Sequence, residues 1–139
     1  MKAKVICLCG STRFTSEMLV IQWELTKQGN VVLSWCALPD GYIQREDKTH
    51  LGEQEDVKEI VDEVHKRKID LADEVFVLNI NGYIGESTRS EIEYAKAHNK
   101  PIKYLQAQTK GGEKKKLPGF RDIIGLFVDD AHNQNKEGE

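Results

Sequence analysis

Residues 78–95 decide the fold, and they read Leu-Asn-Ile-Asn-Gly-Tyr-Ile-Gly-Glu-Ser-Thr-Arg-Ser-Glu-Ile-Glu-Tyr-Ala. The stretch starts at the end of an apolar run, continues through a loop with two glycines, and then takes up helical spacing. A strand that leads through such a loop into a helix is typical of an open α/β sheet. These sheets bind ligands beyond the C-terminal ends of their strands. We therefore expect Glu91, near the first turn of the helix, to border a ligand site.

Apolar runs and helical segments alternate along the rest of the chain. We expect strands at residues 4–9, 31–35, 74–80 and 102–105, and helices at about residues 15–28, 55–71 and 87–98. This alternation predicts a parallel sheet with right-handed crossovers, in a three-layer α/β domain of the flavodoxin or Rossmann-like kind. The residues expected to face the core are Phe14, Met18, Ile21 and Leu25 in the first helix, and Val57, Ile60, Val61, Val64 and Leu71 in the second.

The chain is expected to form one domain over residues 1–130, followed by a frayed tail at residues 131–139. A long loop at residues 36–54 should lie near the same sheet edge, which favours a functional role. The lysine-rich loop at residues 111–119 is expected in solvent, and residues 120–128 fit a short closing helix or edge strand.

Charge and cysteine content narrow the class of protein. A net charge of -3 gives no general attraction to a nucleic acid polymer or an anionic membrane, and no apolar run approaches the ~20 residues of a membrane span. Three cysteines, an odd number, predict reduced thiols in a cytoplasmic protein. Cys7 and Cys9 alternate within the first strand, so we expect them to pack in the core rather than to bind metal. No metal or other cofactor is expected.

The loop at residues 10–13, Gly-Ser-Thr-Arg, follows the first strand. Gly10 would let the backbone approach a ligand closely, and Arg13 offers a guanidinium fork that suits a phosphate. Ser11 and Thr12 add hydroxyl donors. The alternative is a turn in which one of these hydroxyls caps the next helix and Arg13 lies in solvent. The pattern favours neither interpretation.

Glu91 also has two interpretations. It can point into the cleft at the sheet edge, where a carboxylate would be a candidate catalytic group. The spacing Thr88-x-x-Glu91 equally fits a capping box, in which the carboxylate reaches back to the backbone of Thr88. Spacing alone favours the capping box.

With both loops considered, the sequence resembles the nucleoside 2-deoxyribosyltransferase superfamily, which includes the hydrolases that cleave nucleoside 5'-monophosphates. The matching segments are residues 9–13 (Cys-Gly-Ser-Thr-Arg), 72–77 (Ala-Asp-Glu-Val-Phe-Val), 90–95 (Ser-Glu-Ile-Glu-Tyr-Ala) and 99–102 (Asn-Lys-Pro-Ile). The resemblance extends over residues 4–105. Members of this superfamily are commonly homodimers or larger, so it also implies a homo-oligomer.

The resemblance implies a role for each matching residue. Glu91 would be the nucleophile that attacks the anomeric carbon and forms a glycosyl-enzyme ester, so that configuration is retained over two displacements. The Gly10–Arg13 loop would hold a 5'-phosphate, and Ser87 would meet sugar hydroxyls or phosphate. Trp35 or Tyr42 would stack on the base, although simple packing explains each of them as well.

The sequence departs from the superfamily at two positions. His65 stands where an aspartate usually handles the leaving base; His65 or Asp62 could do this work, or His65 could be a surface residue in a charged run. Gly85 stands where the transferases hold the sugar with an aspartate. The resemblance therefore favours an N-glycosidase acting on a nucleoside 5'-monophosphate. A base-exchanging transferase and a non-catalytic nucleotide sensor are the alternatives.

Overall fold

The computed structural model describes residues 3–38 and 56–106, and the account below is limited to them. Its strands are β1 (Val5–Cys9), β2 (Val31–Leu33), β3 (Glu74–Val77) and β4 (Ile102–Tyr104), and its α-helices are α1 (Thr15–Lys27), α3 (Lys58–Leu71) and α4 (Glu86–Ala97). Two 3-10 turns, η1 (Thr12–Phe14) and η2 (Ile80–Gly82), follow β1 and β3. Tyr42, most of the loop at residues 36–54, the lysine-rich loop and the tail at residues 131–139 lie outside the described residues.

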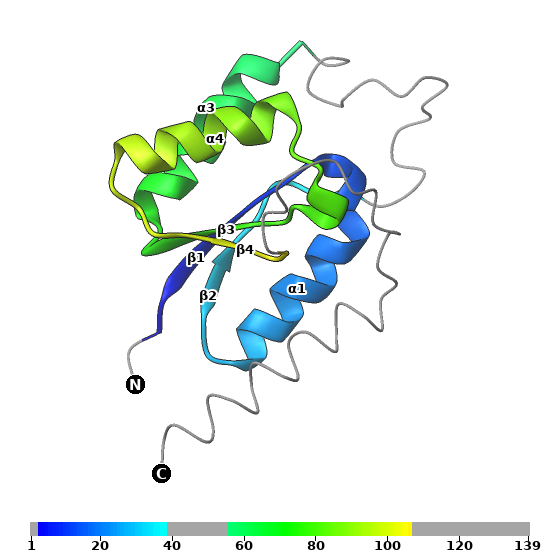
Figure 1. The fold of residues 1–139 in the computed structure, drawn as a ribbon, viewed down its shortest axis with the longest axis vertical. Helices are drawn as coiled ribbons and strands as arrows, with labels where there is room; N and C mark the ends of the chain where they lie inside the picture. Colours follow the sequence, from blue (N-terminus) through cyan, green and yellow to red (C-terminus); the bar gives the residue numbers. More distant parts are fainter. Residues whose placement is uncertain (1–2, 39–55, 107–139) are drawn as a thin grey trace.

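The four strands form one parallel sheet in the order β2-β1-β3-β4. Helix α1 covers one face, while α3 and α4 lie side by side over the other (Figure 1). The predicted three-layer α/β fold is confirmed. From β1 the chain turns to β2 on one side, and later returns to β3 on the other. The C-terminal ends of β1 and β3 therefore form a topological switch point, where ligands bind in folds of this kind.

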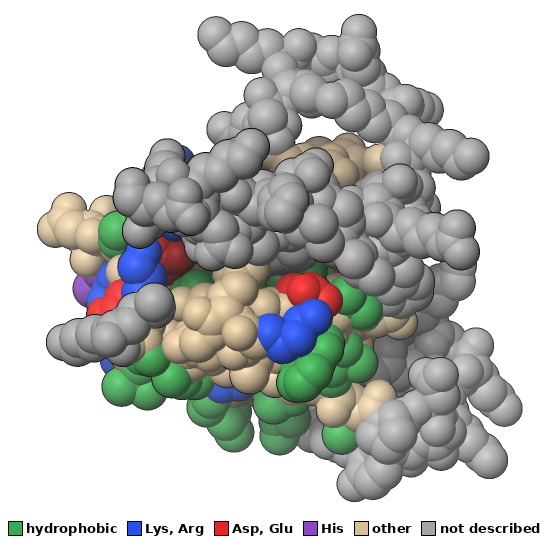
Figure 2. Space-filling model, turned by 90° about the horizontal axis from the view of Figure 1, so that it is seen from below, with side chains coloured by type: hydrophobic (Ala, Val, Ile, Leu, Met, Phe, Trp, Pro, Cys, Tyr) green, Lys and Arg blue, Asp and Glu red, His purple; other side chains and the backbone are tan. Residues whose placement is uncertain are grey.

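The α1 face of the sheet is the more apolar of the two. Alternate residues of β1, Ile6 and Leu8, pack against buried residues of α1. Met18, Ile21 and Leu25 are buried as their spacing predicts, and Phe14 just before α1 is buried with them. Hydrophobic side chains also reach the surface that Figure 2 presents, where charged side chains lie among them. Exposed apolar residues of this kind are ordinary in soluble proteins.

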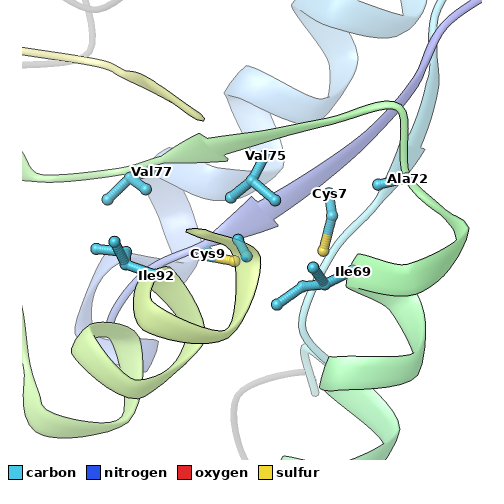
Figure 3. Packing of buried hydrophobic residues seen from close by; sticks show 8 residues of the cluster. Cys7, Cys9, Ile69, Ala72, Val75, Val77 and Ile92 are labelled. Atoms are coloured by element: carbon cyan, nitrogen blue, oxygen red, sulfur yellow. The ribbon is translucent and has the colours of Figure 1, made fainter. Parts of the chain in front are cut away.

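The other residues of β1, Cys7 and Cys9, face α3 and α4. Figure 3 shows their side chains pointing from β1 toward the helices that carry Ile69 and Ile92. Both cysteines have no exposed surface, and the expectation that they are core residues is correct as far as burial goes. Cys36, the third cysteine, is exposed, and all three are free thiols.

The predicted buried face of α3 is wrong. Four of the residues expected in the core are exposed, namely Ile60, Val61, Val64 and Leu71. The helix instead turns His65 and Ile69 toward the sheet, and Ala72 follows at the next position of the same 4-3 spacing. Hydrophobicity failed as a guide because a polar histidine, not an aliphatic residue, occupies the central position over β1.

The strands end earlier than their apolar runs. The run that begins at Glu74 continues through Ile80, but β3 stops at Val77. Asn79, which is buried, donates from Nδ2 to the Gln106 carbonyl at 2.8 Å and accepts from the Gln106 N–H at 2.9 Å. Its side-chain amide thus takes the place of a strand backbone, and the chain is free to turn toward α4.

Both predicted helix stops are confirmed. Gly29 follows α1 with φ +91°, the left-handed conformation that glycine adopts at a helix end, and Asn30 donates to the Leu25 carbonyl at 3.0 Å. Asn99 takes the same left-handed conformation after α4. Among residues 3–38 and 56–106, no helix has the length and apolar content of a membrane span.

Candidate functional site

Glu91 and His65 meet on the side of the sheet that α3 and α4 cover. Glu91 comes from α4 and His65 from α3, and Glu91 Oε2 lies 3.7 Å from His65 Nε2. Both side chains are largely buried, with 15% of Glu91 and 7% of His65 exposed. Two groups that both ionise near neutral pH thus share a desolvated site, which is the usual setting of a functional carboxylate.

The two buried cysteines complete this cluster. His65 Nε2 lies 3.4 Å from Cys9 Sγ and 3.7 Å from Cys7 Sγ. The reason is the period of a strand: residues two apart on β1 point to the same face, so both thiols lie beneath the histidine. The interpretation of His65 as a surface residue is therefore wrong, because its environment is the core.

Burial and mutual contact shift the ionisation of all four groups. Burial raises the pKa of Glu91 to about 7, against the opposing charge of His65. For His65, burial acts to lower the pKa, but contact with Cys7 and the charge of Glu91 raise it above its ordinary value. Contact with Cys9 is the main reason that the pKa of Cys7 falls to about 6, while the same contact and burial raise that of Cys9. At neutral pH, Cys7 is the favoured thiolate and Glu91 is poised between its two forms.

A small hollow opens from Glu91 to the surface. Its volume is about 60 Å³, and it is lined by Asp62, Lys66, Ser87, Ser90 and Glu91. Pockets that enclose a drug-sized ligand measure roughly 300–1,000 Å³, so these residues surround only a few ligand atoms. The predicted candidates Asp62, Ser87 and Glu91 are brought together here. His65 does not line the hollow and lies beneath Glu91 instead.

The capping-box interpretation of Glu91 is wrong. Helix α4 begins at Glu86, its N-cap residue is Gly85, and no side chain caps it. Glu91 thus lies in the second turn, too far along the helix to reach the free N–H groups. Within the described parts of the chain, Glu91 Oε2 is buried and has no hydrogen-bond partner. A buried carboxylate oxygen in this state requires an explanation, because an unpaired polar atom costs free energy.

The Gly10–Arg13 loop follows β1 at the same sheet edge. Ser11 Oγ accepts a hydrogen bond from the Arg13 N–H at 3.3 Å, so the capping role foreseen for Ser11 is present at η1. The Arg13 guanidinium lies over the ring of Tyr83, 3.9 Å from its centroid, a cation–π contact to the loop after β3. Arg13 therefore connects the two loops at the switch point.

Trp35 lies on the opposite side of the sheet from Glu91. It packs in the α1 core, and its Nε1 donates to Thr15 Oγ1 at 3.1 Å. Gly10 has no room for a side chain, because an added Cβ would lie 3.0 Å from the Trp35 ring and 3.1 Å from Leu78. Gly10 is thus explained by close packing, and Trp35 belongs to that packing rather than to the group around Glu91.

The contact of both thiols with His65 was not foreseen from the sequence. The Nε2 of His65 and the Sγ atoms of Cys7 and Cys9 all lie within 4.8 Å of one another, a spacing that could hold a metal ion. The Cys-x-Cys pattern signals that both thiols face the same helices. Which helical residue meets them depends on how α3 sits on the sheet, and the sequence pattern does not contain this information.

No protein-family model matches this chain, and no curated protein matches it at a significant level. The function of the protein is therefore inferred from the chemistry of the residues around Glu91.

Proposed function

We propose that this protein is an N-glycosidase that hydrolyses the base–sugar bond of a nucleoside 5'-monophosphate, with Glu91 as the nucleophile. The observation that carries the proposal is the largely buried Glu91 carboxylate, which lines an open hollow and whose Oε2 has no hydrogen-bond partner in the described chain. Because Oε2 makes no hydrogen bond in the described chain and Glu91 does not cap α4, this carboxylate is available to form a bond to substrate. Its raised pKa also reflects the desolvation that makes a carboxylate more reactive.

The proposed reaction has two displacements at the anomeric carbon. In the first, a carboxylate oxygen of Glu91 forms a bond to this carbon, and the C–N bond breaks with its electron pair leaving on the base, which takes up a proton. In the second, water attacks the same carbon and gives one proton to the group that had protonated the base, which releases Glu91 as the carboxylate and yields the free sugar phosphate. Two inversions retain the configuration of the sugar.

The neighbours of Glu91 suggest separate roles for the two acid candidates. Asp62 lines the hollow and so supports a role in protonating the leaving base. His65 lies beneath Glu91 and contacts both thiols, which supports a positioning role that sets the charge of the nucleophile. Ser87 and Ser90 offer hydroxyl groups to the sugar.

The phosphate would bind at the switch point. The Gly10–Arg13 loop and the loop after β3 follow neighbouring strands at one sheet edge, and the Arg13–Tyr83 contact connects them. A guanidinium suits phosphate recognition because it offers paired N–H donors. Since the hollow is small, we propose that it receives the reacting carbon while the base and phosphate extend over its rim.

The deciding experiment incubates the protein with a panel of nucleoside 5'-monophosphates and detects free base by chromatography. Glu91→Gln should abolish base release while ligand affinity stays within a few-fold. Glu93→Gln is the matched control, since Glu93 is an exposed glutamate on the same helix. Full turnover by Glu91→Gln would rule out the mechanism. If an added second base is incorporated into a new nucleotide, the protein is a transferase. Binding without base release by the wild type would indicate a sensor.

A further inference from the structure

We propose that Cys7, Cys9, His65 and Glu91 form a binding site for one thiophilic divalent cation, with Zn²⁺ as the ion that fits best. Sequence patterning assigns the two cysteines to the core, and the glycosidase chemistry needs no metal. A metal site at these residues therefore goes beyond the proposed function, and the two buried thiols in contact with His65 are the observation that supports it.

The distances from His65 Nε2 to its three neighbours are close to those between ligand atoms of a tetrahedral zinc site. Bonds of about 2.3 Å to sulfur and about 2.0–2.1 Å to nitrogen or oxygen separate neighbouring ligand atoms by roughly 3.3–3.8 Å. His65 Nε2 lies 3.4 Å from Cys9 Sγ, 3.7 Å from Cys7 Sγ and 3.7 Å from Glu91 Oε2. Cys7, Cys9 and His65 thus form a compact group whose ligand atoms all lie within 4.8 Å of one another. Glu91 lies next to His65 and is the candidate for the fourth ligand.

The donor set also suits zinc. Two thiols, an imidazole nitrogen and a carboxylate oxygen are all common zinc ligands, and the sulfur atoms select a thiophilic ion over Mg²⁺ or Ca²⁺. Because these four donor atoms include one nitrogen and one oxygen and no thioether sulfur, they suit Zn²⁺ better than Cu⁺. The Glu91 oxygen that has no hydrogen-bond partner in the described chain would donate a lone pair to the metal as the fourth ligand.

The described residues around the two thiols support a largely closed site. Ile69, Val75 and Val77, all fully buried, pack around the two cysteines, so water is excluded from the sulfur side. The hollow beside Glu91 leads from the surface to this carboxylate, and it is the route by which an ion would enter. The alternative is that Cys7 and Cys9 only fill space in the core. It leaves a buried imidazole and a buried carboxylate oxygen facing each other at 3.7 Å.

One consequence rests on the proposed function. A Glu91 carboxylate that binds zinc through Oε2 is held away from substrate, so the same four residues have a metal-bound state and a catalytic state. Zinc would then inhibit base release, and a chelator would restore it.

The test uses the full chain, treated with a chelator that is then removed, and titrated with Co²⁺ as a spectroscopic substitute for zinc. We expect a sulfur-to-cobalt charge-transfer band and the intense visible bands of tetrahedral Co²⁺. These bands should saturate at one equivalent and be lost on adding Zn²⁺. Absence of the sulfur-to-cobalt band in the wild type would overturn the proposal.

Three cysteine variants locate the site. Cys7→Ala and Cys9→Ala should each weaken Co²⁺ binding by more than about 100-fold, since the loss of a direct ligand should exceed the effect of losing a supporting residue. Cys36→Ala is the control, because Cys36 is exposed and should leave the spectrum unchanged. Loss of the band in Cys36→Ala would contradict the assignment. If the buried variants do not fold, as circular dichroism would reveal, the wild-type and Cys36→Ala spectra still decide the question.

Base release measured with and without Zn²⁺ separates this inference from the proposed function. A cobalt spectrum in a chain that never releases base would remove the glycosidase and leave the metal site. Base release by a chain that shows no sulfur-to-cobalt band would remove the metal site and leave the glycosidase. Full activity at saturating Zn²⁺ would show that Glu91 is not a ligand and would overturn the four-residue site.

Discussion

His65 Nε2 lies 3.7 Å from Glu91 Oε2, and the two side chains reach each other from neighbouring helices over the same pair of buried thiols. Each group therefore titrates in the field of the other, in a largely buried region that a small hollow connects to the surface. An ionised Glu91 gains the attraction of a protonated His65 but loses most of its hydration. The raised pKa of Glu91 indicates that the loss of hydration is the larger effect.

The first prediction concerns the stability of Glu91→Gln as a function of pH. Because the pKa of Glu91 rises from 4.5 to about 7 in the fold, the fold binds this proton more tightly than the unfolded chain does. Protonated Glu91 contributes up to about 3 kcal/mol to the free energy of unfolding. This contribution is complete below pH 4.5 and is lost as the pH rises through 7. Glu91→Gln should therefore be more stable than the wild type at pH 8 and equal to it near pH 4.5.

Denaturant unfolding at several pH values, with a chelator present, measures this difference. Glu93→Gln should show no such pH dependence, since Glu93 is exposed. A Glu91→Gln variant that is less stable at pH 8 would mean that the ionised carboxylate stabilises the fold, so that the attraction of His65 outweighs the loss of hydration.

Arg13 provides the second prediction. Arg13→Ala should raise the KM for nucleoside monophosphates by about 10–100-fold, the effect of losing a charged hydrogen bond, and change that for nucleosides little. Arg67→Ala is the control for charge: Arg67 is an exposed residue of α3 that pairs with Glu63 and Asp70. Equal losses for both substrate classes in Arg13→Ala would contradict a phosphate role.

A third prediction follows from the packing of Gly10 against Trp35. Gly10→Ala should destabilise the fold by about 1–3 kcal/mol, because its Cβ would press on the indole and on Leu78. Trp35→Phe removes the ring atoms that the new Cβ would meet, so the double variant should lose less than the sum of the two single variants. Thermal or urea unfolding of the four proteins gives the coupling energy.

Gly85→Ala is the comparison for this series. Gly85 has an ordinary φ of −74°, and an added Cβ would lie 3.5 Å from its nearest neighbour, the Tyr83 hydroxyl. The free energy of unfolding of the Gly85→Ala variant should differ from that of the wild type by less than about 1 kcal/mol, in the range of an ordinary surface substitution. A strictly additive Gly10→Ala and Trp35→Phe pair would show that the indole does not limit position 10.

Asn79 gives the fourth prediction. Asn79→Ala removes two half-buried hydrogen bonds and leaves the N–H and the carbonyl of Gln106 without this partner, so it should cost about 2–4 kcal/mol. Asn79→Asp keeps the acceptor but sets an oxygen against the Gln106 carbonyl, and it should be destabilising too. Asn30→Ala, which removes one half-buried bond to the Leu25 carbonyl, should cost less than either in urea unfolding. Equal costs for Asn79→Ala and Asn30→Ala would argue against the anchoring role.

Patterning predicted the parts of the fold that depend on nearby residues. The apolar runs located every strand of the described sheet, the spacing of α1 identified its buried face, and Gly29 and Asn99 marked the helix ends. The ends of β3 could not be predicted in this way, because they depend on a hydrogen bond between Asn79 and the distant Gln106.

The site was predicted in part. Glu91 and Asp62 were identified, and the structure brings them to one hollow. The face of α3 was misjudged because most of its aliphatic residues are exposed, whereas His65 points inward together with Ile69. Its contact with Cys7 and Cys9 arises from three-dimensional packing that one sequence does not record.

The packing of Trp35 against Gly10 also provides an optical probe. Trp35 is buried beside the proposed phosphate loop, whereas the other tryptophan of the chain, Trp23, is 61% exposed on α1. The fluorescence of Trp23 should be quenched by iodide and that of Trp35 should not. In a Trp23→Phe background, the emission of the remaining indole would report events at residues 10–13 directly. Ligand titrations could then be followed without a label and without waiting for chemistry.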